Sequence, residues 1–365
     1  MAILNRQAAL AAAALSCAIA VPACGTQGDA SILPDRWPRS GLAGYSLLDA
    51  EQPYAMGKLG WDIDEPLAVP PSAGSVDGDR FVLWGRMNPR AQPAATVLCR
   101  AELRVSMPNG ESAPDQALAP TLPWEGGALR SPTVLSLSED RDERLLLYQG
   151  EQGDVGAADL PADAAAAGEL NKLAVAAPLL SVSMLRAETG GTQIGRIAAV
   201  ADGDRAYLFF TVDDREVRVA QTDRDTLSRW RRDHSIAVPW QVSDVLLPAT
   251  AVLVPPGDKK ALPAERISDL AVRRQITPAG RTRWDVILRA QSGKNVALVA
   301  ATAYGVSSGE TRIGPVTTLL PLDAPLTKPP EGTPGAATWA TLRGRMFLFY
   351  ALRTVQSEIA VAGLP

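Results

Sequence analysis

The chain has 365 residues, which is enough for one large or two ordinary domains with a sizeable core that needs no disulfides. Its 36 Lys and Arg residues against 40 Asp and Glu residues give a net charge of −4, which argues against nucleic-acid binding. One histidine and three cysteines argue against His-based triads, multi-His metal sites and zinc ribbons. We expect no nucleic-acid partner, no metal site and no cofactor.

The first 23 residues predict an export signal. They carry one charge, Arg6, and an apolar stretch from Ala8 to Val21. That stretch is shorter than the roughly 20 residues of a membrane-spanning helix, so residues 1–23 are interpreted as a signal peptide. The segment Val21-Pro22-Ala23-Cys24 resembles the lipobox of bacterial lipoproteins. The resemblance implies that Cys24 is lipidated and becomes the first residue of the mature chain.

Two alternatives to lipidation at Cys24 stay open. One is an ordinary secreted protein cleaved after an alanine, and the other is lipidation at Cys17. Cysteine usage favours Cys24, because the mature chain then keeps only Cys99 and forms no intramolecular disulfide. Acyl chains on Cys24 would attach the protein to a membrane without spanning it.

The residues after Cys24 predict a tether and a location. The stretch from Gly25 to Tyr54 is rich in Gly, Pro, Asp and Ser, without sustained periodicity. We therefore divide the chain into a signal peptide (1–23), a tether (24–54) and a folded domain (55–365). Gly25 directly after the cysteine resembles proteobacterial lipoproteins sent to the outer membrane. The resemblance implies an exported protein anchored at the outer membrane or the cell surface.

The rest of the chain is repetitive. Five segments share an arginine followed by a short apolar or aromatic run, and the arginines are 64, 61, 78 and 62 residues apart. Such short runs, bounded by turn residues, predict buried β strands. The arginines are Arg80, Arg144, Arg205, Arg283 and Arg345.

Each repeat contains further predicted strands. Tight turns with glycine precede three of the arginines, at Asp77-Gly78-Asp79, Asp202-Gly203-Asp204 and Arg343-Gly344. Strands after the arginines are predicted at 154–158, 216–222, 295–302 and 358–362. Strands before them are predicted at 131–135, 197–200, 267–272 and 338–342. Outer strands are predicted at 172–175 and 313–319.

Small sheets repeated about every 60 residues predict an all-β fold, a five-bladed β-propeller of four-stranded antiparallel blades. Because the last repeat ends just after its third strand, we expect Trp61–Val69 to supply its outer strand. A pair of β-sandwiches is the alternative. A helix is predicted only between Asp163 and Leu170, in a loop.

The segment Asp202–Phe210, continued by Val219–Asp223 and Leu227–Trp230, resembles five-bladed propeller glycosidases of the arabinanase and fructosidase type. Those families repeat Asp-Gly, an aromatic strand, Ala-x-Ser/Thr, Asp and Trp. The resemblance implies two catalytic carboxylates on innermost strands that face a central channel, since glycoside hydrolysis uses such a pair.

The catalytic pair is missing from the strands that we match to those positions. In the first repeat, Pro70–Val76 has no acid, and in the second Thr133 replaces the expected Asp. The third repeat carries Arg196, and only the fourth offers a carboxylate, Asp269. Hydrolysis is therefore predicted to be lost, unless loop residues such as Glu188 or Glu265 supply substitutes.

Arg196, Asp269 and Trp339 lie on or beside predicted inner strands, so we interpret them as ligand-binding residues at the channel mouth. A structural ion pair or a hydrogen bond between blades is the alternative. Tryptophans can also stack on sugar rings, although packing between blades is the simpler role for most of them. The tryptophans concerned are Trp61, Trp124, Trp230, Trp240 and Trp339. We expect His234 to be solvated in a charged turn and Cys99 to be buried.

These observations predict a lipid-anchored propeller that acts at the cell envelope as a non-catalytic binding or scaffolding module. Its partners would be the membrane, through Cys24, and a glycan or an envelope protein. A glycan-active hydrolase with displaced carboxylates is the alternative. A third possibility is a subunit of an envelope assembly that uses the propeller rim.

Overall fold

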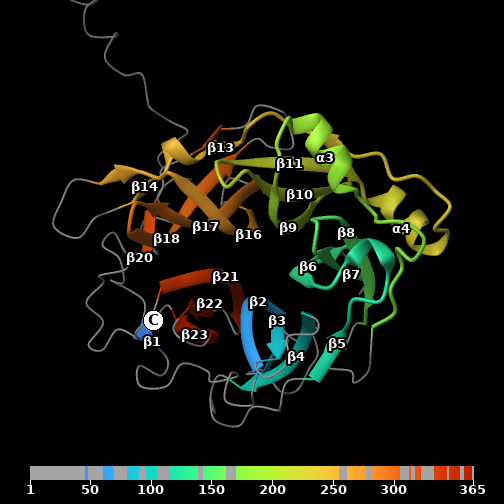
Figure 1. Cartoon of the computed structure of the whole chain (residues 1–365), viewed down its shortest axis with the longest axis horizontal. Helices are drawn as coiled ribbons and strands as arrows, with labels where there is room; N and C mark the ends of the chain where they lie inside the picture. Colours follow the sequence, from blue (N-terminus) through green and yellow to red (C-terminus); the bar gives the residue numbers. More distant parts are fainter. Residues whose placement is uncertain are drawn as a thin grey trace, which may run out of the picture.

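Antiparallel β-sheets make up most of the chain in the computed structural model, and they surround a common centre (Figure 1). The structure describes residues 46–47, 61–69, 80–89, 96–104, 115–138, 143–161, 170–254, 261–276, 282–304, 312–313, 317–321, 333–342, 345–353 and 357–363. Within these ranges, no helix combines the length and the apolar character needed to cross a membrane.

The first two sheets follow the order of the chain. The first holds β2 (Trp61–Val69), β3 (Arg80–Pro89), β4 (Val97–Arg104) and β5 (Asp115–Leu118). The second holds β6 (Leu129–Ser136), β7 (Arg144–Gly150) and β8 (Val155–Leu160). A short 3-10 helix, η2 (Pro123–Glu125), connects the two sheets.

The third and fourth sheets have divided outer strands. The third holds β9 (Ile194–Asp202), β10 (Arg205–Val212) and β11 (Glu216–Asp223), with β12 (Gln241–Val242) and β13 (Leu247–Pro248) both on β11. The fourth holds β16 (Arg266–Ile276), β17 (Thr282–Ser292) and β18 (Asn295–Tyr304), with β19 (Arg312–Ile313) and β20 (Thr317–Pro321) both on β18. Between them lie η3 (Ala249–Ala251) and a two-stranded sheet of β14 (Leu253–Val254) and β15 (Leu262–Pro263).

The fifth sheet joins the two ends of the described chain. It holds β21 (Thr333–Leu342), β22 (Arg345–Arg353) and β23 (Ser357–Gly363), and β1 (Ser46–Leu47) pairs with β23. The prediction that Trp61–Val69 is the outer strand of this sheet is therefore wrong. That segment is β2, the first strand of the first sheet, and its register is fixed by pairing with β3.

The repeated arginine pattern is confirmed as a strand pattern. Strands β3, β7, β10 and β22 begin at their arginines, and β17 begins one residue before Arg283. Gly203 has a φ of +57° in the turn between β9 and β10, a conformation that glycine adopts without strain. The other two predicted turns, 77–79 and 343–344, lie outside the described residues.

The central strand of the third sheet, β10, buries both of its faces. Along β10, Ala206, Leu208 and Phe210 pack into a cluster shared with the second sheet. The alternate residues Tyr207 and Phe209 pack into a cluster shared with the fourth sheet, where Trp284 meets Phe209 edge-on at 5.4 Å between ring centroids. A sheet of a two-layer sandwich has only one packed face, so the sandwich alternative is wrong.

The first strand of each sheet contacts the first strands of its neighbours. Strand β9 contacts β6 and β16, and β21 contacts β16 and β2, which in turn contacts β6. In Figure 1 these five strands line the centre of the molecule. Residues on the first strands of different sheets are therefore brought close together.

The expectation of four-stranded sheets is only partly met. The second sheet has three described strands, and the predicted outer strand at 172–175 makes a single bridge, Lys172 with Ala158. In the third sheet, β12 pairs with Ala220–Gln221 and β13 with Glu216–Val217, so two short pieces cover one edge. A proline in β13 has no backbone N–H to donate, which suits it to an edge position.

Two helices were not predicted. Helix α3 (Val182–Thr189) is capped by Ser181, whose hydroxyl accepts from the Met184 N–H, and it ends at Gly190 in the left-handed conformation. Helix α4 (Arg224–Arg232) buries Leu227 and Trp230 on one face. The helix predicted over 163–170 falls almost wholly outside the described residues, and Leu170 itself is not helical.

Candidate functional site

A β-bulge interrupts the first strand of each of the five sheets at matching places, and in β9 the register shift lies between Ile194 and Ile197, next to Arg196. In the other four strands the pairing register shifts after Asp64 in β2, Arg130 in β6, Ser268 in β16 and Pro334 in β21. The next residues in β2, β6 and β16, which are Glu65, Ser131 and Asp269, have φ values of +57°, +54° and +57°. A bulge redirects side chains, and positive φ at a residue other than glycine carries a conformational cost. Such strain is common at functional sites.

Arg196 joins two of these bulges. It lies on β9, with its guanidinium between carboxylates from two other sheets. Its Nη2 is 3.6 Å from Oε2 of Glu65, and its Nη1 is 3.4 Å from Oδ1 of Asp269. All three side chains are at least nine-tenths buried. The three residues form a buried acid–base–acid triad.

Backbone and hydroxyl groups hold both carboxylates in place. The backbone N–H of Ser131 donates to Oε2 of Glu65 at 2.5 Å, which connects the bulges of β2 and β6. The hydroxyl of Ser268 donates to Oδ2 of Asp269 at 3.1 Å. Four first strands therefore contribute to the triad and its support.

The triad carries two negative charges and one positive charge. Two carboxylates on inner strands are the groups that glycoside hydrolysis uses, one as acid and one as base or nucleophile. Here, however, a guanidinium lies between them and makes an ion pair with each. The arrangement gathers charged, hydrogen-bonding groups at one buried place, and the guanidinium fills the space between the carboxylates.

The structure brings together two of the three predicted ligand-binding residues. Arg196 and Asp269 are in contact, as the alternative of a structural ion pair also foresaw. Trp339 lies on β21, where the guanidinium of Arg273 sits 4.9 Å from its ring centroid. Its side chain is 7% exposed, so little of the indole face is open to a sugar.

Glu65 was missed by the sequence analysis. The first repeat was matched through Pro70–Val76, which lies outside the described residues, whereas the first strand of that sheet is β2. The expectation that this strand has no acid is therefore wrong. A signal was present: Glu65-Pro66 and Ser131-Pro132 both precede a short apolar run, and both are bulges.

The other candidate residues make structural contacts or are exposed. The hydroxyl of Thr133 accepts from the backbone N–H of Ala199, which connects the second and third sheets. Glu188 is exposed on α3, and Glu265 is exposed and accepts from the N–H of Gly293, so neither joins the triad. His234 is exposed, as expected, and Cys99 is buried with its thiol donating to the Gly85 carbonyl.

Three of the other candidate tryptophans pack against the hydrophobic core, and the side chain of the fourth lies outside the described residues. Trp230 and Trp240 are buried in the cluster shared by the second and third sheets. Trp124 is partly buried and donates from its indole nitrogen to the carbonyl of Ala174 at 3.2 Å. Nothing is described of the Trp61 side chain. The packing role expected for most tryptophans is confirmed for Trp230 and Trp240.

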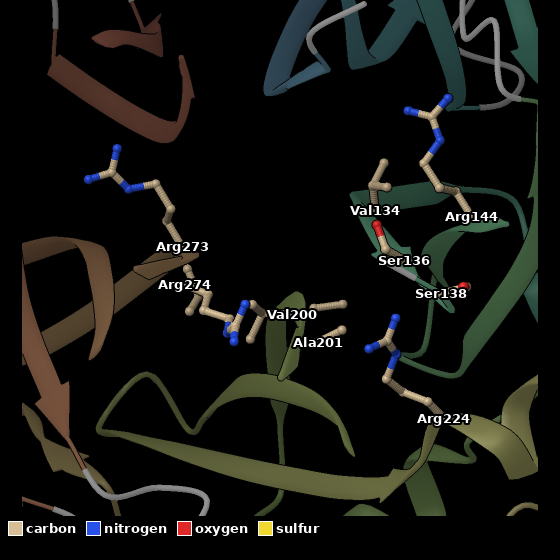
Figure 2. Close-up of a pocket in the computed structure, with 11 residues that line it drawn as sticks. Val134, Ser136, Ser138, Arg144, Val200, Ala201, Arg224, Arg273 and Arg274 are labelled. Carbon is tan, nitrogen blue, oxygen red and sulfur yellow. The ribbon is translucent and has the colours of Figure 1, made fainter. Parts of the chain in front are cut away.

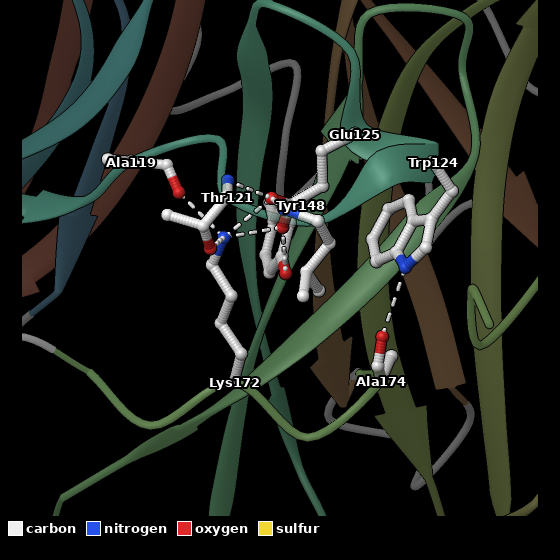
Figure 3. Close-up of polar contacts among 8 residues, drawn as sticks. Ala119, Thr121, Trp124, Glu125, Tyr148, Lys172 and Ala174 are labelled. Atoms are coloured by element: carbon white, nitrogen blue, oxygen red, sulfur yellow. Dashed lines mark hydrogen bonds and ion pairs between the residues drawn. The ribbon is translucent and has the colours of Figure 1, made fainter. Parts of the chain in front are cut away.

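A second buried polar cluster surrounds Glu125 (Figure 3). Nζ of Lys172 is 2.6 Å from both carboxylate oxygens and also donates to the carbonyl of Ala119. The hydroxyl of Tyr148 donates to Glu125 at 2.8 Å, and burial together with that carboxylate raises the pKa of Tyr148 far above its usual range. The Glu125 carboxylate is fully buried and fully hydrogen-bonded, so this cluster is a structural clasp that ties η2 to the second sheet.

Metal binding has no candidate in the part of the chain that the structure describes, because no three His, Cys, Asp or Glu side chains are grouped there to hold an ion. Cys24, the predicted lipidation site, lies outside the described residues.

Comparison with known proteins shows that the fold is similar to that of solved glycoside hydrolase structures. No protein-family model and no curated protein matches the sequence. Among solved structures, an alpha-L-arabinofuranosidase from Podospora anserina, in complex with cellotriose, has a TM-score of 0.54 at 11% identity over 90% of this chain and 98% of that one. An endo-arabinase from Bacteroides thetaiotaomicron has a TM-score of 0.51 at 11% identity over 83% and 94%.

A third structure, described as a glycoside hydrolase, has a TM-score of 0.55 at 13% identity, covering 84% of this chain and 88% of that one. At such identities the likeness shows the fold and not the chemistry. The chain is therefore similar to glycosidase-type β-propellers, as the sequence resemblance implied.

Proposed function

We propose that the chain is a five-bladed β-propeller that binds an oligosaccharide at the end of its channel where Glu65, Arg196 and Asp269 meet, and does not hydrolyse it. Five meander-like sheets whose first strands contact one another in sequence support the five blades. The pairing of β1 with β23 supports closure by the N-terminal side of the chain.

The position of Arg196 carries the non-catalytic part of the proposal. A scissile bond has to lie between the two carboxyl groups that cleave it, and here the guanidinium takes that place. Its ion pairs also use carboxylate oxygens that would otherwise accept from a water or sugar hydroxyl. A buried, charged triad held on rigid strands nevertheless offers the fixed donors and acceptors that orient a polar ligand.

A glycan is the ligand class that the fold favours. The arabinofuranosidase of similar fold was solved with cellotriose. Glu65 and Asp269 supply acceptors for sugar hydroxyls, and Arg196 supplies donors. Binding would rest on hydrogen bonds more than on aromatic stacking, since Trp339 is covered by Arg273.

A glycan-active hydrolase is the second candidate. One observation favours it: two carboxylates from different sheets do lie on either side of one small group, which places them near each other. Displacement of the guanidinium by a substrate would leave a pair of acids at a glycosidase-type position.

We also propose that the protein is exported and anchored to a membrane. A signal peptide over residues 1–23 and lipidation at Cys24 would export the protein and attach it to a bacterial membrane, at the outer membrane or the cell surface. The apolar segment, the lipobox-like residues and the single remaining Cys99 support this. Mass spectrometry of the purified mature protein would test it, because diacylated Cys24 at the N-terminus has a characteristic mass.

Binding is tested by isothermal titration calorimetry of the full protein with arabinotriose, xylotriose and cellotriose. We expect at least one to bind, and Arg196→Ala to weaken that binding about tenfold or more, because a charged hydrogen bond is lost. Arg218→Ala is the matched control, since Arg218 pairs with Glu216 on β11 outside the triad. Equal affinity in Arg196→Ala, or no binding of any sugar, would contradict the proposal.

A further inference from the structure

A pocket of about 630 Å³ opens among the later residues of the first strands β6, β9 and β16 (Figure 2). Its wall contains four arginines, Arg144, Arg224, Arg273 and Arg274, and the hydroxyls of Ser136 and Ser138. None of the described residues that line it is acidic.

The pocket is separate from the triad of Glu65, Arg196 and Asp269. On β9, the pocket residue Ala201 follows Arg196 by five positions, a distance of about 17 Å along a strand. On β16, Arg273 and Arg274 follow Asp269 by four and five positions. The pocket therefore lies toward the other end of these strands.

Two of the four arginines make ion pairs, although one of the carboxylates, Asp285, is shared with the buried Arg283. Arg273 makes an ion pair with the buried Asp285 at 3.0 Å, and Arg274 makes one with Asp202 at 2.7 Å. Arg144 donates to the carbonyl of Pro161 at 2.8 Å. These contacts hold the side chains in position at the pocket wall.

Arg224 differs from these three half-buried arginines in being buried and in having two neighbouring guanidinium nitrogens unsatisfied. The residue is 7% exposed, and its Nη1 donates to the carbonyl of Gly203 at 2.5 Å. Its Nε and Nη2 are buried and have no hydrogen-bond partner in the part of the chain that the structure describes. Figure 2 shows the guanidinium pointing toward the space between Ala201 and Ser138.

The two unsatisfied nitrogens determine the kind of ligand. Nε and Nη2 form one edge of the planar guanidinium, and their N–H bonds point the same way, which is the geometry that binds two oxygens of one anion. A buried donor without an acceptor is destabilising, so a group that supplies acceptors is favoured here. Ser136 offers another donor, which suits an anion with more than two oxygens.

We propose that this pocket binds a small ligand through a tetrahedral oxyanion, a phosphate or sulfate group, held by the Nε–Nη2 edge of Arg224. The pocket volume accommodates a group of sugar size attached to that anion. This proposal is independent of glycan binding at the triad, because the two sites share no residue.

The test uses the full protein and two simple probes, inorganic phosphate and inorganic sulfate, at constant ionic strength. Thermal unfolding and isothermal titration calorimetry would measure binding, with sodium acetate and sodium chloride as comparison anions. We expect phosphate or sulfate to raise the melting temperature and the other two salts to leave it unchanged. The anion that binds distinguishes a phosphorylated from a sulfated ligand.

Substitutions then assign the binding to Arg224. We expect Arg224→Met, which keeps the apolar stem, to lower the affinity about tenfold or more. Arg232→Met is the matched control, because Arg232 is exposed on the same helix and lies outside the pocket. Should Arg224→Met fail to fold, Arg224→Lys keeps the charge but loses the two-pronged edge, and we expect the same loss.

Three outcomes would overturn the proposal. The first is the absence of phosphate and sulfate binding in the parent protein. The second is an equal effect of acetate or chloride, which would indicate a general response to salt. The third is unchanged affinity in the folded Arg224 variant.

Discussion

Arg196 on β9 reaches Asp269 on β16, with 3.4 Å between Nη1 and Oδ1, and so ties together two sheets whose strands are more than seventy residues apart in sequence. The same guanidinium meets Glu65 from a third sheet. Because the guanidinium makes an ion pair with both carboxylates, it occupies the space that a substrate would need between them.

Removing Arg196 should destabilise the fold. We expect Arg196→Met to lower the free energy of unfolding by about 3 kcal/mol, because it leaves two buried carboxylates facing each other without a cation. The triple substitution with Glu65→Gln and Asp269→Asn should recover part of that loss, since no uncompensated charge remains. Urea denaturation checks both. A single substitution as stable as the parent would show that the triad does not stabilise the folded state.

Removing Lys172 from the cluster around Glu125 should lower the free energy of unfolding about as much as removing Arg196. Lys172 is the cation that meets the fully buried Glu125, so Lys172→Met should cost about 3 kcal/mol in unfolding free energy. The exposed Lys294→Met is the matched control and should change stability by less than about 0.5 kcal/mol. Thermal and urea denaturation measure both. Equal stabilities of the two variants would refute the role of the clasp.

Gly195 should not tolerate a side chain. A Cβ there would lie 2.1 Å from Oγ1 of Thr211, and the carbonyl of Gly195 accepts from the amide of Gln149 at 2.9 Å. We expect Gly195→Ala to cost about 1–3 kcal/mol through overpacking and to move the neighbouring Arg196. Gly127→Ala, where the nearest atom would be at 3.6 Å, is the control. Thermal denaturation compares them, and unchanged stability in Gly195→Ala would show that the strand relaxes freely.

Asp213 should give the protein a measurable acid dependence. Hydrogen bonds from the hydroxyl of Thr192 and the backbone N–H of Gln193 hold the pKa of Asp213 below its ordinary 3.8. A lowered pKa means that the stabilisation is complete above pH 3.8 and is lost as the pH falls below it, through the folded-state value. We expect Asp213→Asn, which cannot titrate, to be less stable than the parent at pH 6 and to approach it in stability below pH 3.8. Urea denaturation across this range is the measurement, and a difference that does not change with pH would contradict the assignment.

Strands such as β7 and β10 could be predicted because both of their faces are buried. Arg144–Gly150 and Arg205–Val212 are almost continuously apolar after their arginines, which identifies them without any knowledge of neighbours. Strand β2 was assigned to the wrong sheet because its sequence does not reveal which strand it pairs with. Nothing local distinguishes an outer strand of the last sheet from the first strand of the first sheet, and the pairing with β3 decides it.

The candidate site was less predictable than the strands. Arg196 and Asp269 could be selected from their place on inner strands, but their contact depends on how β9 and β16 pack. Glu65 required the recognition that Glu-Pro and Ser-Pro mark equivalent bulges. Helix α4 buries Leu227 and Trp230 on one face, yet these residues were matched only to a repeated family motif and no helix was predicted there. The pocket around Arg224 could not be predicted, because its residues come from five separate elements or their connections.

The most direct test of the central claim is the release of new reducing ends from an oligosaccharide that the protein is first shown to bind. Our account predicts that the sugar is bound and recovered intact after prolonged incubation, because Arg196 fills the space between Glu65 and Asp269. New reducing ends produced by the parent protein and abolished in both Glu65→Gln and Asp269→Asn would contradict it, and would identify the two carboxylates as a working hydrolytic pair.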